Sequence, residues 1–358
     1  MDLPVMPPLK PMLAKAIPAI PDEGDLAFEP KWDGFRCLVF RDGDEIELGS
    51  RNTKPLTRYF PELLDPLMAA LPERCVVDGE IIVSLDDELA FDALQQRIHP
   101  AESRVERLSV ETPAEIVLFD VLAVDDVDLT GEPFRDRRRV LETMSAAFEP
   151  PVYLVPSTQD RATAQEWYVA FEGAGLDGLI AKPREGAYVP DKRTQFKVKH
   201  TRTADVVVAG YRMHKDGEGV GSLLVGLHDD EGRLHHMGVA ASFKASLRAE
   251  LVDVLAPHIV DDPAEHPWAA WVDPEAHADG LMPGAPNRWS GGRDSIDWVP
   301  LRCDLVAEVK YEATLNGRFR GTTRFVRWRP DRDPESCTYD QLEVPVPIGL
   351  SEVLGAEG

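Results

Sequence analysis

An acidic pair lies inside a run of apolar residues at 76–83, which reads Val-Val-Asp-Gly-Glu-Ile-Ile-Val. Apolar residues flank the pair on both sides without a break, so the run predicts a buried strand rather than a hairpin tip. A buried carboxylate costs free energy unless it is paired or binds a ligand. Asp78 and Glu80 therefore indicate a strand that carries a binding site.

A lysine upstream of this strand lies in an aromatic setting, in the stretch Phe-Glu-Pro-Lys-Trp-Asp-Gly-Phe-Arg at 28–36. Glu29 precedes Lys31 by two residues and Arg36 follows it by five. Desolvation or nearby cations make a lysine amine a usable nucleophile, and an arginine suits phosphate oxygens. Taken alone, so short a pattern favours a solvated surface strand. Only further candidate site residues elsewhere in the chain would favour a nucleophilic Lys31.

Two further segments carry candidate ligand contacts. Residues 115–124 predict a central strand that contains Phe119, for which core packing is the alternative to stacking on a ligand. Arg51 follows a predicted hairpin at 36–48 and suits a phosphate or ribose contact. The alternative for Arg51 is a solvated turn residue.

An aspartate and three lysines between residues 176 and 199 are further candidates for a binding site. Residues 176–182 place Asp177 at the mouth of an apolar strand that ends at Lys182. Lys197 and Lys199 alternate in a strand-like run and so share one face, as two phosphate-binding lysines would. We favour this interpretation over a pair of solvent-facing lysines.

Amphipathic helices are predicted at 61–71, 135–148 and 163–174. The second of them contains three consecutive arginines. We expect this arginine run, Arg137, Arg138 and Arg139, to lie on a solvated helix face.

The pattern changes after residues 201–203, where we expect a hinge. Short strands with glycine-rich turns follow, together with a helix at 243–259 and a proline- and tryptophan-rich insertion at 260–298. The strands predict a five-stranded barrel of the OB type, a common platform for nucleic acids. They lie at 205–211, 222–228, 234–240, 304–311 and 323–328. The expected domains are therefore 1–202 and 203–358.

The charge balance limits the partners. The chain has 63 acidic and 39 basic residues, a net charge of −24, and such a surface repels phosphate backbones. A nucleic-acid enzyme of this composition needs its basic residues on one face. A C-terminal arginine run is a candidate for that face, with a solvated edge strand as the alternative: Arg318, Arg320, Arg324, Arg327, Arg329 and Arg332.

Length and composition predict a two-domain protein of the cytoplasm. At 358 residues the chain exceeds a typical single core. It has no run of about 18 apolar residues and no signal pattern, so we expect no membrane association. Its four cysteines are isolated, which argues against a zinc site or a disulfide framework.

In their order, these segments resemble the motifs of the covalent nucleotidyltransferases, which comprise DNA ligases, RNA ligases and mRNA-capping enzymes. The stretch from Lys31 to Arg36 resembles the nucleophile motif, Lys-x-Asp-Gly-x-Arg. The resemblance covers nearly the whole chain and is closest to short bacterial ATP-dependent DNA ligases of repair, namely the C-type enzymes and the ligase module of the D-type. Two positions depart from the family pattern, because Asp177 replaces a glutamate and Arg332 replaces a lysine.

The resemblance implies an α+β fold with an ATP-grasp-like adenylation domain of antiparallel sheets and helices, followed by an OB barrel. It implies three steps, in which Lys31 takes AMP from ATP, the adenylate moves to the 5′-phosphate of a nick, and the 3′-hydroxyl displaces AMP. Mg²⁺ or Mn²⁺ would assist. The expected partners are nicked duplex DNA and a repair polymerase or an end-binding protein, and the expected state is a monomer.

The family's residue roles carry over to matching positions. Catalysis is expected from Lys31, Lys197, Lys199 and Arg329, and metal binding from Glu80 and Asp177. The other expected contacts with ATP come from Glu29 to the adenine amino group, Phe119 to its ring, and Arg36, Arg51 and Lys182. Nucleic-acid contacts are expected from Arg36, Arg51, Arg324 and Arg327.

Other functions stay open at this point. An RNA ligase or a GTP-dependent capping enzyme shares the lysine motif. NAD is disfavoured as donor, because NAD-dependent ligases resemble longer chains with a four-cysteine zinc module. A non-catalytic nucleic-acid-binding OB protein is a further alternative, although Lys31, Glu80, Lys197 and Lys199 are all retained.

Overall fold

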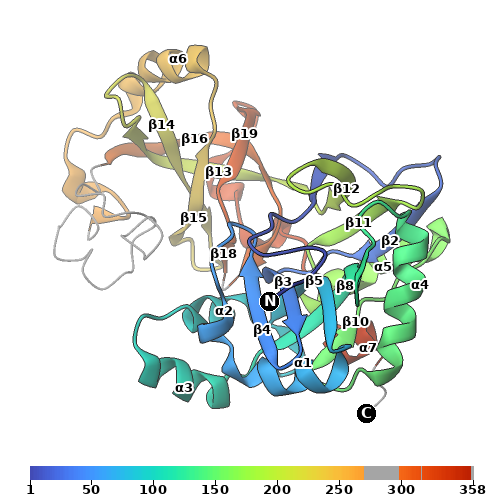
Figure 1. The fold of residues 1–358 in the computed structure, drawn as a ribbon. Helices are drawn as coiled ribbons and strands as arrows, with labels where there is room; N and C mark the ends of the chain where they lie inside the picture. The colour runs from blue at the N-terminus through green and yellow to red at the C-terminus, as the bar shows by residue number, and fades with distance from the viewer. Residues whose placement is uncertain (270–297, 316, 356–358) are drawn as a thin grey trace. The chain divides into compact units, whose positions relative to one another are not determined.

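The computed structural model describes residues 1–269, 298–315 and 317–355. The chain forms two compact units, one made of Met1–Lys199 together with Pro345–Gly358 and the other of His200–Val344. Figure 1 shows the elements of both units. The predicted second domain, 203–358, is therefore wrong at its C-terminal end, because the last residues pack with the first unit.

The first unit contains two larger sheets. One has six strands, with β10, β8, β5, β3 and β4 in sequence across the sheet and β9 beside β8, and the other has the order β1, β12, β11, β2. The strands are β1 (Leu13–Ile17), β2 (Leu26–Pro30), β3 (Phe35–Asp42), β4 (Glu45–Ser50), β5 (Arg74–Ile82), β6 (Ser84–Leu85), β7 (Glu88–Leu89), β8 (Glu115–Val124), β9 (Val127–Asp128), β10 (Val152–Leu154), β11 (Gly178–Pro183) and β12 (Arg193–Lys199). Both sheets are mixed, since β10 runs parallel to β8 and β1 parallel to β12. The expectation of antiparallel sheets was wrong at these two pairs.

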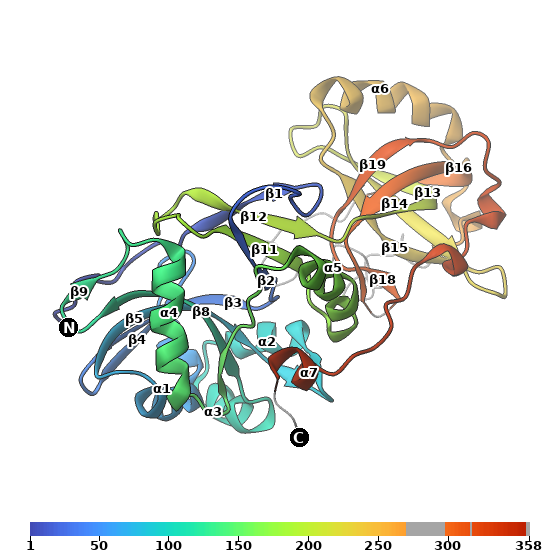
Figure 2. The same cartoon turned by 90° about the vertical axis from the view of Figure 1, so that its right-hand side faces the viewer.

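The helices of this unit pack against the sheets. They are α1 (Leu64–Ala70), α2 (Phe91–Arg97), α3 (Glu102–Glu111), α4 (Phe134–Met144), α5 (Arg161–Ala170) and α7 (Leu350–Leu354). Helix α4 contacts β8, and α5 contacts β2 and β11 (Figure 2). Successive side chains of β3 point to opposite faces of its sheet, and both faces are buried. Cys37 and Val39 belong to the core cluster on one face, and Leu38 and Phe40 belong to the cluster on the other.

Helix α4 differs from the sequence expectation. Arg137 is fully buried and pairs with Asp120 of β8, with Nε–Oδ1 and Nη2–Oδ2 distances of 2.8 and 2.9 Å. Arg138 is also buried, and only Arg139 lies on the solvated face. The prediction of a solvated arginine run was wrong because two of its side chains reach carboxylates inside the unit.

The C-terminal segment closes one side of the first unit. Leu350 and Val353 of α7 are buried in a cluster that includes Trp32 and Phe119. The Leu350 backbone N–H donates to the Asp87 carbonyl at 2.7 Å. Apolar burial at both positions of this short helix accounts for the return of the chain to the first unit.

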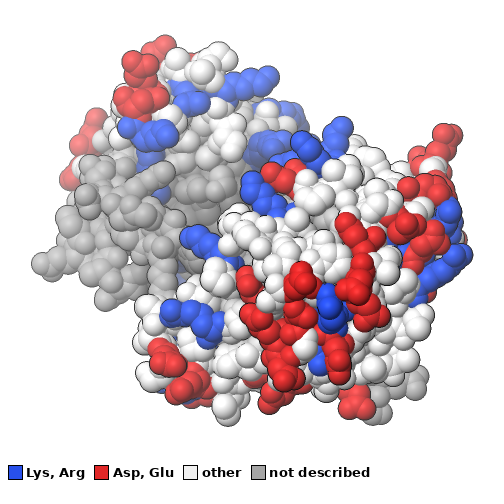
Figure 3. Space-filling model, viewed as in Figure 1, with Lys and Arg blue, Asp and Glu red and all other residues white. Residues whose placement is uncertain are grey.

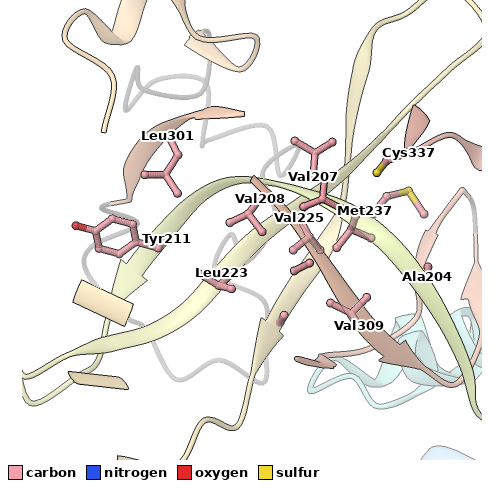
Figure 4. Close-up of a cluster of buried hydrophobic side chains, with 14 of the residues drawn as sticks. Ala204, Val207, Val208, Tyr211, Leu223, Val225, Met237, Leu301, Val309 and Cys337 are labelled. Carbon is pink, nitrogen blue, oxygen red and sulfur yellow. The ribbon is translucent and has the colours of Figure 1, made fainter. Parts of the chain in front are cut away.

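The second unit is a five-stranded barrel. Its strands are paired in the order β13, β14, β15, β19, β16, and β16 pairs back with β13. The barrel strands are β13 (Arg202–Met213), β14 (Val220–His228), β15 (Leu234–Ala241), β16 (Val299–Tyr311) and β19 (Thr323–Trp328), and the remaining elements are β17 (Thr314–Leu315), β18 (Arg318–Phe319) and α6 (Ala245–Leu255). Buried aliphatic side chains such as Val207, Val225 and Val309 fill the barrel (Figure 4).

All five strands expected for the barrel are present, and the expected helix at 243–259 corresponds to α6. The assignment of the barrel to the OB type stays a prediction. Most of the expected insertion at 260–298 lies outside the described residues. Among the residues that the structure does describe, no helix is both long and apolar enough to cross a membrane.

Candidate active site

Lys31 is held against Asp177 by its own backbone. The Lys31 N–H donates to the Gly178 carbonyl at 2.9 Å, and the Asp177 N–H donates to the Lys31 carbonyl at 3.0 Å. This reciprocal pair brings the two side chains together, and Lys31 Nζ lies 2.7 Å from Asp177 Oδ2. The exposed fractions of the two side chains are 17% and 11%. A lysine and a carboxylate distant in the sequence thus form a partly buried ion pair.

A second lysine shares the same carboxylate. Lys199 Nζ lies 2.9 Å from Asp177 Oδ2. Burial raises the pKa of Asp177, but the Lys31 and Lys199 ammonium groups outweigh burial and lower it below its usual value. Burial lowers the pKa of Lys197, and repulsion from Lys199, Lys31 and Arg51 adds to this effect. The structure therefore places two of the predicted lysines, Lys31 and Lys199, on one carboxylate, with Lys197 near enough for its pKa to respond to both of them.

Glu80 lies on β5, next to the turn that follows Lys31. There is no room for a Cβ at Gly34, because the backbone of Ile81 and the Glu80 side chain lie too close. Burial raises the pKa of Glu80 to about 7, against the opposing influence of the Arg36 and Lys31 charges. Glu80 and Asp177 thus both lie near Lys31. Two carboxylates can supply oxygen ligands of the kind that Mg²⁺ prefers, with waters and substrate oxygens as its other ligands.

Arg36 forms an ion pair with a buried carboxylate. Its Nε and Nη2 each lie 2.6 Å from an oxygen of Asp78, a side chain that is fully buried. The Tyr188 hydroxyl donates to Asp78 at 2.6 Å and accepts from the Met12 N–H at 3.0 Å. The Arg36 guanidinium also lies 4.5 Å from the centre of the Phe119 ring. Asp78, paired in this way, supports the site from inside the sheet.

Glu29, Lys182 and Phe119 form a second buried group. Lys182 Nζ donates to Glu29 Oε2 at 2.7 Å and to the Phe119 carbonyl at 2.9 Å, and it lies 4.8 Å from the centre of the Phe119 ring. Burial raises the pKa of Glu29 and lowers that of Lys182. Glu29 Oε1 is buried and has no hydrogen-bond partner among the described residues. A buried acceptor without a partner fits a ligand that brings an N–H donor, such as the amino group of adenine.

The remaining predicted residues lie elsewhere. Arg51 is exposed in the turn after β4. Arg329 belongs to the second unit, where its Nη1 lies 2.9 Å from both oxygens of Asp205 and its Nη2 2.8 Å from Asp331. Arg332 Nε lies 3.7 Å from Asp205.

Two exposed arginines lie on β19 of the second unit. Arg324 is exposed, and Arg327 is exposed with its Nε 2.7 Å from Glu308. In the view of Figure 3, acidic side chains gather over part of the first unit and basic side chains form groups of their own. Charge of the two signs is therefore unevenly distributed over this face.

The comparisons with known proteins match both halves of the chain. A family model described as "ATP dependent DNA ligase domain" matches residues 11–199, and one described as "ATP dependent DNA ligase C terminal region" matches residues 216–332. The chain belongs to the ATP-dependent DNA ligase family. The prediction of an ATP-dependent DNA ligase is thereby confirmed.

Relatives of this family cover the chain from end to end. DNA ligase C of Mycobacterium tuberculosis is 52% identical over 362 residues, covering 99% of each chain, and DNA ligase C1 of Mycolicibacterium smegmatis is 47% identical with the same coverage. The fold of the ligase family is also seen in a solved Lig E DNA ligase structure, at a TM-score of 0.55 and 17% identity, covering 89% of this chain and 99% of that one. The resemblance to the C-type enzymes, predicted from the motifs, is confirmed.

Proposed function

We propose that this ligase seals nicks between a 5′-phosphate and a 3′-hydroxyl in duplex DNA during repair, through an adenylate on Lys31. In the first step the Lys31 amine attacks the α-phosphorus of ATP, a phosphoramide bond forms and pyrophosphate leaves. In the second step AMP passes to the 5′-phosphate of the nick and Lys31 is released. In the third step the 3′-hydroxyl attacks that phosphate and AMP leaves.

The observation that carries this proposal is the pair of lysine side chains that share Asp177 Oδ2. Lys31 and Lys199 both contact this oxygen, at 2.7 and 2.9 Å. In this arrangement the nucleophile is already beside the cations that the reaction needs, because negative charge builds on the transferred phosphate in every step. Lys197 and Lys199 would contact that phosphate, and Asp177 would orient the Lys31 amine.

Glu80 and Asp177 are the residues that would hold Mg²⁺. The ion would supply charge neutralisation at the transferred phosphate. Glu80 needs to be ionised for this role, and its pKa of about 7 means that the neighbouring Arg36 and Lys31 charges matter for its state.

The adenine base would occupy the space beside Phe119, with its amino group donating to Glu29 Oε1. Lys182 supports this position by holding the other Glu29 oxygen at 2.7 Å. We propose that Arg51 receives the 5′-phosphate of the nick, because it is exposed and close enough to influence the pKa of Lys197. Arg36 then acts by positioning Phe119 and Asp78.

The barrel unit would serve as an OB-type platform for DNA, with Arg324 and Arg327 as exposed phosphate contacts. Arg329 would act only in the first step, at the pyrophosphate that leaves. A monomer acting in the cytoplasm, together with a repair polymerase or an end-binding protein, is the proposed context.

The test is a label transfer. The full chain is incubated with magnesium and α-labelled ATP, GTP or labelled NAD, then denatured and examined for covalent label. We expect label from ATP alone, and none in Lys31→Ala protein that is folded. The labelled enzyme should then seal a nicked DNA duplex without further ATP, and equal or better sealing of an RNA nick would overturn the DNA assignment. Label on the Lys31→Ala protein would contradict the role of Lys31.

A further inference from the structure

The two oxygens of Glu29 have different surroundings. The side chain is 2% exposed, and Oε2 accepts from Lys182 at 2.7 Å. Oε1 has no hydrogen-bond partner among the described residues, and Arg138 Nη1 of α4 lies 3.6 Å from it. This separation is too long for a strong hydrogen bond. Arg138 thus brings a positive charge to Oε1 while leaving the lone pairs of that oxygen unused.

Arg138 is fixed at this distance by the helix that carries it. Its Nε donates to Glu142 Oε1 at 2.8 Å, one helical turn further along α4. The Arg138 side chain is 10% exposed, whereas that of Arg139 next to it is 71% exposed. Arg138 therefore points into the unit, and the pair with Glu142 restrains its movement toward or away from Glu29.

The protonation of Glu29 decides which base it can recognise. An ionised carboxylate only accepts hydrogen bonds, whereas a protonated one also donates. Adenine presents an amino group at its 6-position, which donates, and guanine presents a carbonyl oxygen there, which accepts. An ionised Glu29 therefore suits adenine and opposes guanine, and a protonated Glu29 loses this discrimination.

We propose that Arg138 is a specificity-determining residue, which keeps Glu29 Oε1 unprotonated as an acceptor for the 6-amino group and so selects ATP over GTP. This inference rests on the proposed contact between Glu29 and the base. Among the described residues, the charged groups that act on Glu29 are Lys182 of β11, Arg138 of α4 and Asp120 of β8. Burial raises the pKa of Glu29 above its usual value, the Lys182 and Arg138 charges oppose this rise in part, and the Asp120 charge adds to it. Loss of Arg138 therefore moves Glu29 toward the protonated form.

The experiment measures the initial rate of covalent labelling of the full chain from α-labelled ATP and from α-labelled GTP, at about pH 6 and about pH 9. For wild type we expect a high ATP-to-GTP ratio at both values. For Arg138→Met we expect the ratio to fall about tenfold at the lower pH, and to recover at the higher pH, where Glu29 ionises again. Arg138→Lys keeps the charge and should retain most of the selectivity.

Two further variants make the result decisive. Arg139→Met is the matched control on the same helix and should leave the ratio unchanged. Glu142→Ala removes the oxygen that accepts from Arg138 Nε, at a half-exposed position that tolerates substitution. Arg138 is then free to move away from Glu29, so the ratio at about pH 6 should fall in the same direction as in Arg138→Met.

An unchanged ratio in both Arg138→Met and Glu142→Ala, or an equal loss of labelling from both donors at both pH values, would overturn the inference and leave Arg138 with a structural role only. Absence of label in wild type would instead overturn the proposed function, so the two failures are distinguishable.

Discussion

The Lys31 ammonium lies 2.7 Å from the Asp177 carboxylate, although the two residues are 146 positions apart in the chain. The backbone hydrogen bonds between Lys31 and residues 177 and 178 keep this distance short. The nucleophile of the proposed reaction is therefore oriented before any substrate binds.

Asp177→Asn should slow the formation of the Lys31 adenylate by about 10- to 100-fold. The reason is that an amide holds the Lys31 ammonium more weakly than a carboxylate does, and a 10- to 100-fold loss of rate corresponds to about 1.4–2.7 kcal/mol. Single-turnover labelling with ATP measures the effect. The control is Asp191→Asn, which removes an exposed carboxylate that pairs with Lys10. Equal rates for wild type and Asp177→Asn would contradict the orienting role.

Arg329→Ala should slow labelling from ATP by about 100-fold or more, because the proposed pyrophosphate contact belongs to the first step alone. The same variant should seal a nick that already carries AMP on its 5′-phosphate at nearly the wild-type rate. Arg302→Ala, another paired arginine of the second unit, is the control. Equal losses in both reactions would show that Arg329 supports the fold of the unit and has no step-specific role.

Arg137→Met should lower the free energy of unfolding of the first unit by about 3–5 kcal/mol, because it leaves the buried Asp120 carboxylate without its partner. Arg139→Met on the same helix should change it by less than about 0.5 kcal/mol. Urea unfolding of the two variants, side by side, measures the difference. A small effect in both would mean that Asp120 finds another partner or becomes protonated.

Glu80 makes the stability of the first unit depend on pH in a predictable direction. Its pKa is about 7 in the folded chain against 4.5 for a free glutamate, so the folded state binds more protons between these values. Stability should therefore fall as the pH rises from about 4.5 to about 7. In metal-free buffer, the free energy of unfolding of wild type relative to Glu80→Gln should drop by about 2 kcal/mol across that window. A flat difference between the two proteins would show that Glu80 keeps its ordinary pKa in the folded chain.

Leu350→Ala should destabilise the first unit by about 3 kcal/mol, because it opens a cavity beside Trp32 and Phe119. Val346→Ala, in the same C-terminal segment but with a side chain that is 84% exposed, should have almost no effect. Hydrogen exchange of the β5 and β8 amides reports on this unit alone. Unchanged protection in Leu350→Ala would mean that α7 is dispensable for the sheet.

Much of the fold followed from the amino-acid sequence, and the reasons are local. The strands β8 and β19 have the predicted bounds, because each is a run of strand-forming residues bounded by turns. Glu80, Phe119 and Lys197 also lie on strands, as predicted. Periodicity alone could not show that Arg36 pairs with Asp78, since this contact depends on which strands become neighbours and in which register.

The errors came from residues whose partners are distant in the chain. Arg137 and Arg138 resemble a solvated face when arginine is counted as polar, yet they share the inward face of α4 with Leu141. The recurrence of Phe134, Arg138 and Leu141 at helical spacing was a usable signal for this face. The short helix α7 shows no such pattern in the sequence. Its two apolar residues are buried only because the folded chain brings them to the cluster that contains Trp32 and Phe119.

The return of the C-terminal segment changes how the two units can be separated in the laboratory. The chain leaves the first unit at Lys199 and re-enters it at Pro345, so the barrel is an insertion within the catalytic unit rather than an appendage to it. A single truncation near residue 200 would remove α7 from the apolar cluster around Trp32. The remaining fragment would expose the apolar side chains of that cluster and would tend to aggregate. An internal deletion that joins Lys199 to Pro345 through a flexible linker keeps both parts of that cluster, and it is the form in which an isolated adenylation module should be made.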